Sequence, residues 1–222
     1  MFFPTMVVTI VSGISDSNIT ELEIPATING KPITHICDSA FKDCKSITSI
    51  TISKGVTSIG DSAFENCYAL TSVVIPDGVT SIEWPAFTHC KNLASVVIPY
   101  GVTTIESSTF SYCTALVSVT IPSSVTSIDS YAFENCDSFK TVYYTGTAEE
   151  WATISIANLN GELINATRSY YSATEPIIKG NFWHYIDGIP TPWTDVTPIY
   201  SGGLAYTLSA DGTYYILSGI GT

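Results

Sequence analysis

The six cysteines are the residues of this chain with the widest chemical repertoire, because thiols form disulfides, bind metals and act as nucleophiles. Five of them, Cys44, Cys67, Cys90, Cys113 and Cys136, follow one another at steps of 23 residues, and Cys37 lies outside this series. The chain has no Cys-x-x-Cys pair, the spacing typical of structural zinc sites. We therefore expect free thiols and no metal ligand.

The regular spacing also argues against disulfides among the five cysteines. If each occupies the same place in successive structural units, their Cβ atoms point in one direction and do not face each other as a bridge requires. Parallel thiols inside a stack fit a buried apolar row better. Cys37 alone has a neighbour that it could approach, Cys44, and whether these two pair is left open.

The remaining candidates for catalysis are the three histidines, which lie far apart in the sequence at His35, His89 and His184. His89 directly precedes Cys90, but a Cys–His nucleophile also needs an orienting group from elsewhere in the fold. No nucleophile elbow, phosphate-binding glycine loop or calcium-loop motif is present. We predict a non-enzymatic chain without catalytic residues, cofactor or metal.

The step of 23 residues extends to apolar positions, which marks an internal repeat. The rows in register are Ile33, Val56, Val79, Val102 and Val125; Ile36, Ile59, Ile82, Ile105 and Ile128; Ala40, Ala63, Ala86, Thr109 and Ala132; Phe41, Phe64, Phe87, Phe110 and Phe133; Ile47, Leu70, Leu93, Leu116 and Phe139; and Ile50, Val73, Val96, Val119 and Val142. One unit cannot bury its own apolar face, so the units must stack and cover each other.

Written from Leu70, one unit reads L-x-x-V-x-I-P-x-G-V-x-x-I-x-x-x-A-F-x-x-C. The alternation in L-x-x-V-x-I predicts a strand with one buried face, and the proline after it ends the strand. Gly78 and Gly101 follow where a turn can require positive φ, although Ser124 takes that place in a later unit. The V-x-x-I segment is expected to return the chain across the far side.

The A-F-x-x-C segment is expected to form a single helical turn, because Asp or Ser precedes it as a plausible N-cap. Ser62 and Glu65 even have the spacing of a capping box.

This pattern resembles the BspA-like leucine-rich repeat, also called the Treponema pallidum type, whose short repeats carry the I-P, V-x-x-I and A-F-x-x-C signatures. The resemblance covers roughly residues 5–146 and lacks the asparagine of the common leucine-rich consensus. It implies a repeat solenoid of 23-residue coils with one parallel β-sheet, short helical turns and a small C-terminal α+β cap. It also implies an extracellular or cell-surface protein, mainly of host-associated bacteria, that serves adhesion and protein binding.

The chain divides into four expected parts: an N-terminal strand cap (1–20), the solenoid (21–146), a C-terminal capping region (147–200) and a hairpin (201–222). The first coil has five extra residues around Asn29–Gly30, a turn signal. The segment "YYILSGIG" (214–221) resembles "VVTIVSGIS" (7–15), so we expect a second repeat array to begin there, within a longer parent protein.

The capping region begins with a predicted helix, since Thr147 and Glu150 have capping-box spacing and Trp151 and Ile154 follow on one face. Two strands are expected in 167–173 and 181–188, the second ending at Asp187–Gly188. The cap-like G-T-x-E-E-W and W-H-Y-x-D-G-x-P segments follow many arrays of the family that the chain resembles.

The composition limits the classes of partner that the chain is expected to bind. Apolar residues make up 45% of the chain, but charged residues are only 13%, with eight Lys and Arg and a net charge of −12. Without a basic patch we expect no nucleic-acid partner and no binding to anionic membranes. No apolar run has transmembrane length, and residues 2–11 alternate like a strand and lack the basic n-region of a signal peptide, so no direct membrane insertion is expected.

Function is therefore sought at outward positions. A protein ligand on the sheet face is the first hypothesis, and a merely solvated Ser/Thr surface is its plain alternative. Candidate partner-binding residues are Thr51, Val74, Val97, Thr120, Tyr143, Trp84 and Tyr100. The other functional hypothesis is a glycan- or cell-wall-binding module that stacks sugars on Trp183, Tyr185 and Trp193, although these rings could instead cover the apolar end of the solenoid.

Overall fold

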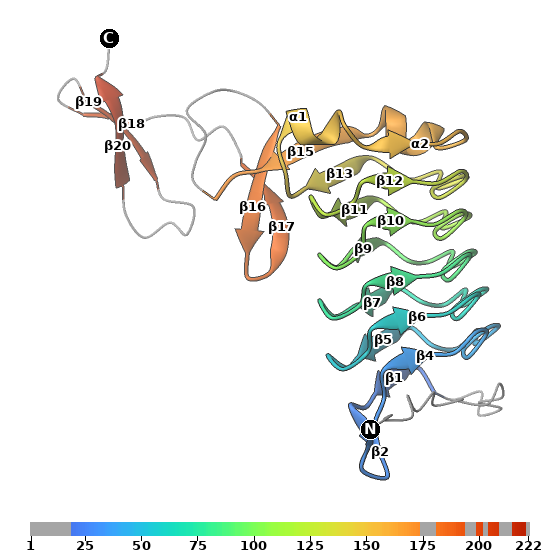
Figure 1. The fold of residues 1–222 in the computed structure, drawn as a ribbon. Helices are drawn as coiled ribbons and strands as arrows, with labels where there is room; N and C mark the ends of the chain where they lie inside the picture. Colours follow the sequence, from blue (N-terminus) through green and yellow to red (C-terminus); the bar gives the residue numbers. More distant parts are fainter. Residues whose placement is uncertain (1–18, 174–180, 194–198, 202–203, 209–214, 221–222) are drawn as a thin grey trace, which may run out of the picture. The chain divides into compact units, whose positions relative to one another are not determined.

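The structure is a computed structural model that describes residues 19–173, 181–193, 199–201, 204–208 and 215–220. The chain forms two compact units, the first reaching Tyr171 and the second beginning at Ser172. In the first unit the chain winds into a stack of coils, each with a long strand, a short strand and a turn that leads to the next coil (Figure 1). The predicted solenoid is confirmed.

The long strands pair in parallel and in register, so equivalent residues of successive repeats stand side by side, as Val96 with Val119 and Val119 with Val142. Neighbours are joined in the orders β1-β5-β7 and β9-β11-β13-β15. The long strands are β1 (Glu21–Ile24), β5 (Ser49–Ile52), β7 (Ser72–Val74), β9 (Ser95–Val97), β11 (Ser118–Ile121), β13 (Thr141–Tyr144) and β15 (Thr167–Tyr171).

The V-x-x-I segments also form parallel sheets, so the expectation of a single sheet is wrong. Their order is β4-β6-β8 and β10-β12-β14. From β4 to β12, each short strand contributes one buried isoleucine next to one half-buried polar residue, which is enough for pairing with the neighbouring coils. The short strands are β4 (His35–Ile36), β6 (Ser58–Ile59), β8 (Ser81–Ile82), β10 (Thr104–Ile105), β12 (Ser127–Ile128) and β14 (Ser155–Ile156).

The A-F-x-x-C segments are chains of turns, and the expected helical turn is absent from the repeated coils. Within a coil, the Cys67 amide donates to the Phe64 carbonyl at 3.2 Å, whereas the Phe64 amide donates to the Ala86 carbonyl of the next coil at 2.8 Å. Two places in the turns have positive φ, except that Pro85 occupies the first place in the third turn; positive φ breaks helical geometry and directs alternate amides at the neighbouring coil. These residues are Ser39, Ser62, Ser108 and Tyr131, and Asp43, Asn66, His89, Tyr112 and Asn135.

The predicted capping box at Ser62 and Glu65 is wrong for the same reason. Ser62 has φ of 54°, whereas an N-cap residue has extended backbone. Its hydroxyl instead bonds the Glu65 side chain, which also pairs with Lys42 at 2.7 Å.

The glycines after the long strands do not have positive φ, so that expectation fails as well. Their role is close approach: a Cβ at Gly78 would lie 2.9 Å from the Lys54 carbonyl oxygen of the preceding coil. Ser124 is tolerated at the equivalent place because its hydroxyl donates to the Val102 carbonyl at 2.9 Å.

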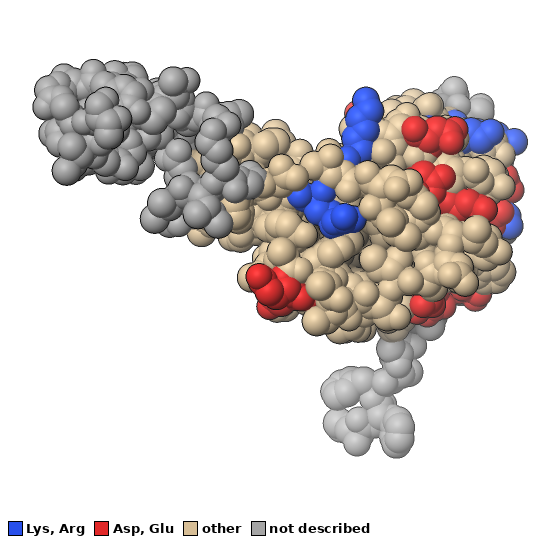
Figure 2. All heavy atoms as spheres, turned by 90° about the horizontal axis from the view of Figure 1, so that it is seen from above, with Lys and Arg blue, Asp and Glu red and all other residues tan. Residues whose placement is uncertain are grey.

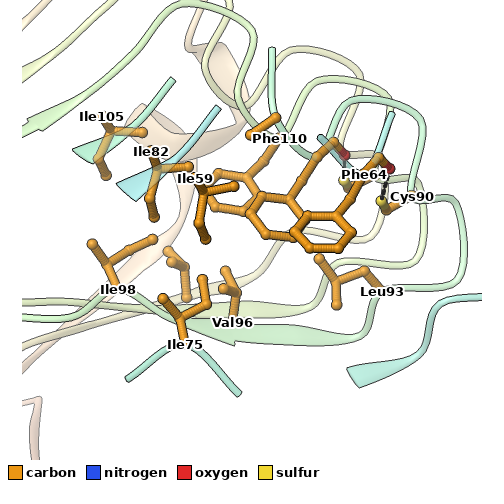
Figure 3. Packing of buried hydrophobic residues seen from close by; sticks show 14 of the residues in the cluster. Ile59, Phe64, Ile75, Ile82, Cys90, Leu93, Val96, Ile98, Ile105 and Phe110 are labelled. Carbon is orange, nitrogen blue, oxygen red and sulfur yellow. Dashed lines mark hydrogen bonds between the residues drawn. The ribbon is translucent and has the colours of Figure 1, made fainter. Parts of the chain in front are cut away.

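The core is a continuous row of buried side chains inside the stack (Figure 3). Neighbouring phenylalanine rings are nearly parallel, with centroids 5.0 Å apart for Phe64 and Phe87 and 5.6 Å for Phe87 and Phe110. The row ends on Phe139, 5.4 Å from Phe133. A fully buried Phe contributes about 2–3 kcal/mol, which offsets the conformational entropy lost by a short coil.

The extra residues of the first coil form a hairpin, as the turn signal predicts. Strands β2 (Thr27–Ile28) and β3 (Lys31–Pro32) are antiparallel and joined by Asn29 and Gly30, with φ of 50° and 74°. The predicted N-terminal strand cap at 1–20 falls almost entirely outside the described residues.

The last coil of the first unit departs from the repeat. Helix α1 (Ala148–Trp151) has the predicted capping box, in which Thr147 and Glu150 bond each other's backbone amides. Helix α2 (Gly161–Asn165) takes the place of the phenylalanine turn, and Leu163 is buried. Because β14 and β15 pair with β12 and β13, the coil continues both sheets.

The second unit contains the hairpin of β16 (Phe182–Ile186) and β17 (Ile189–Pro192), with Asp187 and Gly188 at positive φ. It also contains an antiparallel sheet of β18 (Ile199–Ser201), β19 (Leu204–Leu208) and β20 (Tyr215–Ile220). The expected second array is not tested by these strands and stays a prediction. Among the described residues, no helix has the length and apolar character needed to cross a bilayer.

Candidate binding surface

The outward side chains of the long strands form a face whose character changes along the stack. Near the first coils it is polar, with Thr51 exposed. In the middle, Val74 of β7 and Val97 of β9 are 59% and 45% exposed. Further along, Tyr143 is half-buried. The apolar exposure is therefore concentrated in two adjacent coils.

Thr120, predicted as another exposed position of this face, is buried at 3% exposure, so that prediction is wrong. Its register neighbours are Val97 on β9 and Tyr143 on β13. A threonine between two larger side chains is shielded by them, which the sequence pattern alone does not reveal.

The two aromatic candidates are both exposed but belong to different parts of the coil. Tyr100, 67% exposed, lies in the turn three residues after Val97. Trp84, 53% exposed, follows the short strand β8. Tyr100 thus follows the long strand that carries Val97, whereas Trp84 follows a short strand.

Sequence reasoning missed two further apolar residues beside the valines, Ala94 and Val117. Both are exposed, and the Val117 amide donates to the Ala94 carbonyl at 2.8 Å, which makes them neighbours on successive coils. An alignment of the repeats could have revealed them, because the same position is Thr48 and Thr71 in the two earlier coils and becomes apolar only at Ala94 and Val117.

The aromatic residues proposed for sugar stacking differ in accessibility. Trp183 is buried at 0% exposure, so it presents no face to a sugar and that candidate is wrong. Tyr185 is 42% exposed and packs edge-on against Trp183 at 4.8 Å. Trp193 stacks on His184 at 3.8 Å and donates its indole N–H to the Ser172 carbonyl. Only Tyr185 retains a large exposed surface.

The repeated thiols are buried hydrogen-bond donors rather than reactive groups. Four of the five, from Cys67 to Cys136, donate to the carbonyl of the phenylalanine in the preceding coil, as Cys90 does to Phe64 at 3.3 Å (Figure 3). Burial raises the pKa of Cys67 and Cys136 to about 12 and keeps both thiols protonated at neutral pH. Cys44 carries a free thiol, so it does not bridge to Cys37.

Charged side chains are unevenly distributed over the surface (Figure 2). In the view down the stack, acidic side chains lie mostly along the side of the turns, and much of the remaining surface is uncharged (Figure 2). Burial together with the nearby carboxylates of Asp129 and Glu83 raises the pKa of Glu106. Within the described ranges, no three His, Cys, Asp or Glu side chains are placed to hold a metal ion.

Comparison with known proteins agrees with this geometry. The family described as "BspA type Leucine rich repeat region" matches residues 14–140 in 6 copies. The chain belongs to the BspA-type leucine-rich repeat family. The resemblance noted in the sequence is thereby confirmed, and a protein-binding repeat module is consistent with this membership.

Two solved structures with TM-scores above 0.5, from T. pallidum and pneumococcus, share the fold. A leucine-rich repeat protein of T. pallidum is 26% identical with a TM-score of 0.55, and the match covers 69% of this chain and 74% of that one. The pneumococcal vaccine antigen PcpA is 17% identical with a TM-score of 0.54, over 70% of this chain and 37% of that one. A leucine-rich cell surface protein from Faecalibacterium prausnitzii is 28% identical with a TM-score of 0.48, over 90% of this chain and 54% of that one. No curated protein matches the chain at a significant level.

Proposed function

We propose that this chain is a non-enzymatic module that binds a protein ligand through the apolar middle of its long-strand face. The proposed contact surface, named the central patch, consists of Val74, Ala94, Val97, Tyr100 and Val117. The observation that carries the proposal is the adjacent exposure of Val74 and Val97 on neighbouring coils. Aliphatic side chains gathered on a surface gain free energy when a partner removes them from water.

The setting of the patch supports a broad protein partner. Stacked coils present a wide surface of the kind that repeat proteins use to bind broad partners. Tyr100 supplies a large exposed ring of the kind that anchors many interfaces. Thr51 and Tyr143 remain proposed contacts at its margins, and Trp84 remains a proposed contact apart from the patch, after the short strand β8. The buried Thr120 is no longer proposed.

A location at the cell surface or outside the cell, and a role in adhesion, belong to the same proposal. They are supported by what the family resemblance implies. Surface labelling of cells that produce the natural parent protein would test the location, and labelling confined to the cell interior would contradict it.

Site-specific photocrosslinking tests the binding surface. A benzophenone amino acid placed at Val97 is expected to crosslink a protein from extracts of bacterial or host cell surfaces, and one placed at Thr126 is not. Thr126 is a suitable control because it is exposed and directly precedes the short strand β12. Equal crosslinking from both positions would contradict the proposal.

A pair of double variants tests the same surface without an introduced crosslinking amino acid. Val74→Asp with Val97→Asp should abolish binding of the crosslinked protein, since charges placed in an apolar contact lose hydration without a partner. Thr80→Asp with Thr126→Asp adds the same charge elsewhere and should bind normally. Thermal melts of both variants verify that the fold is intact.

Glycan binding is retained as the alternative function, with Tyr185 as its remaining exposed ring. A glycan array should then show a signal that Tyr185→Ala removes. An array without signal leaves protein binding as the one proposed function.

A further inference from the structure

The stack has an interruption that affects both sheets at the same junction. Strand β7 pairs with β5 and β9 pairs with β11, but β7 and β9 do not form a ladder. The short strands stop at the same place, since β8 pairs with β6 and β10 with β12. We call this junction the seam; it lies between the coil of residues 70–92 and the coil of residues 93–115.

Individual hydrogen bonds show how the seam differs from its neighbours. Just before the short strands, the Thr80 amide donates to the Thr57 carbonyl at 2.9 Å, and the Thr126 amide to the Thr103 carbonyl at 2.8 Å. The equivalent bond across the seam, from Thr103 to Thr80, is missing among the bonds of these described residues. The Thr80 and Thr126 hydroxyls bond the same carbonyls as their amides do, those of Thr57 and Thr103. Among the bonds of the described residues, the Thr103 hydroxyl makes no such bond to Thr80 across the seam.

The end of each short strand gives the same result. The Glu83 amide donates to the Ile59 carbonyl and the Asp129 amide to the Ile105 carbonyl, both at 2.9 Å. In the described structure, the Glu106 amide has no such bond to Ile82. Before the long strands, the bond from the Ala94 amide to the Thr71 carbonyl across the seam is 3.3 Å long, against 2.8 Å for its equivalent in the next junction, from Val117 to Ala94.

Side-chain packing on the sheet side is looser at the seam as well. Val73 is half-buried, whereas Val96 and Val119 of the same row are buried. A small apolar pocket, too small for a water molecule, lies where Ile82 of one coil meets Ile98 and Ile105 of the next.

The turn side of the same junction keeps its hydrogen bonds and its ring stacking. The His89 amide donates to the Ser111 carbonyl at 2.9 Å, and the hydroxyls of Thr88 and Ser111 lie 2.6 Å apart, both buried. The His89 ring stacks on Tyr112 at 4.5 Å, beside the stacked rings of the phenylalanine row. Weak bonding on one side and strong bonding on the other is the geometry of a hinge.

We propose that the seam is a hinge at which two blocks of coils, residues 19–92 and 93–171, open and close on their sheet side about the bonded turns. In a stack of repeats, cooperativity passes only through interfaces between neighbours, so a weak interface lets the blocks fluctuate separately. The inference concerns the stack itself and does not depend on the central patch binding a ligand.

Native-state hydrogen exchange with matched core variants tests the hinge. Leu70 and Leu116 occupy the same row on opposite sides of the seam, and both are 0% exposed. Leu70→Ala is expected to speed amide exchange ~100-fold in 19–92 while leaving 93–171 unchanged, and Leu116→Ala is expected to do the reverse.

A milder pair keeps the test informative if alanine prevents folding. Ile59→Val and Ile128→Val each remove one methylene from a 0% exposed side chain on either side of the seam. Each should speed exchange roughly tenfold within its own block only. If either variant accelerates exchange equally in both blocks, the coils form one cooperative unit and the hinge is excluded.

Discussion

The backbone amides of a turn find their hydrogen-bond acceptors in different ways in the repeated coils and next to the last coil of the first unit. In a repeated coil the Phe110 amide of the turn donates to the backbone carbonyl of Ala132 in the next coil, at 2.9 Å. In the last repeat no equivalent turn follows, and the Phe133 amide donates to the side-chain oxygen of Asn160 at 3.2 Å. Repetition supplies partners from the backbone, whereas an end has to supply them from side chains.

The substitution extends to the end of the turn, whereas the Tyr131 amide at its start still bonds the backbone carbonyl of Asn158. The Asn135 amide, whose counterparts bond backbone carbonyls, here bonds the carboxylate of Glu162 at 3.1 Å. Asn160 itself is buried, and its amide group also donates to the carbonyls of Asp129 and Ala157. One asparagine thus satisfies three backbone groups that would otherwise be buried without a partner.

The largest expected effect separates the middle of the phenylalanine row from its end. Phe64 is fully buried and stacks on rings on both sides, whereas Phe139 is half-buried at the end of the row. Phe64→Ala should lower the free energy of unfolding by about 4 kcal/mol, and Phe139→Ala by about 2 kcal/mol. Urea denaturation followed by circular dichroism measures the free energy of unfolding of both variants. Equal losses would show that a ring in the middle of the row contributes no more stability than the ring at its end.

The next effect concerns the asparagine that closes the stack. Asn160→Ala removes three hydrogen bonds from buried backbone groups and should cost about 3 kcal/mol in unfolding free energy. Asn158→Ala is the matched control, because Asn158 is exposed and contributes its backbone carbonyl to Tyr131. A similar loss in both variants would contradict the role assigned to the Asn160 side chain.

These two regions also differ in how much the sequence reveals. The rows of Phe, Ile and Cys repeat every 23 residues, so the stack and its buried positions could be predicted from spacing. The positive φ values of the turns could not, because they occur at residues as different as Ser62 and Tyr112. Asn160 breaks the register, and nothing in its local sequence distinguishes a buried bridging amide from an exposed one.

For the candidate surface, the repeat indicated which residues face outward but not how much of each is exposed. Val74 and Val97 were recognised from register, whereas the burial of Thr120 depends on the size of its neighbours in the adjacent coils. The seam has no sequence signature of its own, because the strands on both sides keep the consensus and only their pairing changes.

The smallest effect contrasts carboxylates of the two regions. Glu106 stands in a repeated coil, where burial and the like charges of Asp129 and Glu83 raise its pKa. Glu149 lies in the first turn of α1 in the last coil, where hydrogen bonds from its own backbone amide and from Thr147 lower its pKa. The two carboxylates therefore have opposite effects on stability at neutral pH.

A raised pKa means that the folded state holds the Glu106 proton more tightly, so stability falls as pH rises through the carboxyl range. Glu106→Gln should then stabilise the fold at pH 7 by about 0.5 kcal/mol, a gain that vanishes in acid. The lowered pKa of Glu149 contributes stability that is lost as pH falls, so Glu149→Gln should weaken the fold slightly at pH 7 and have no effect in acid. Thermal melts at a series of pH values measure both variants. If both substitutions change the melting temperature at pH 7 in the same direction, the environments of the two carboxylates do not differ in the way the structure indicates.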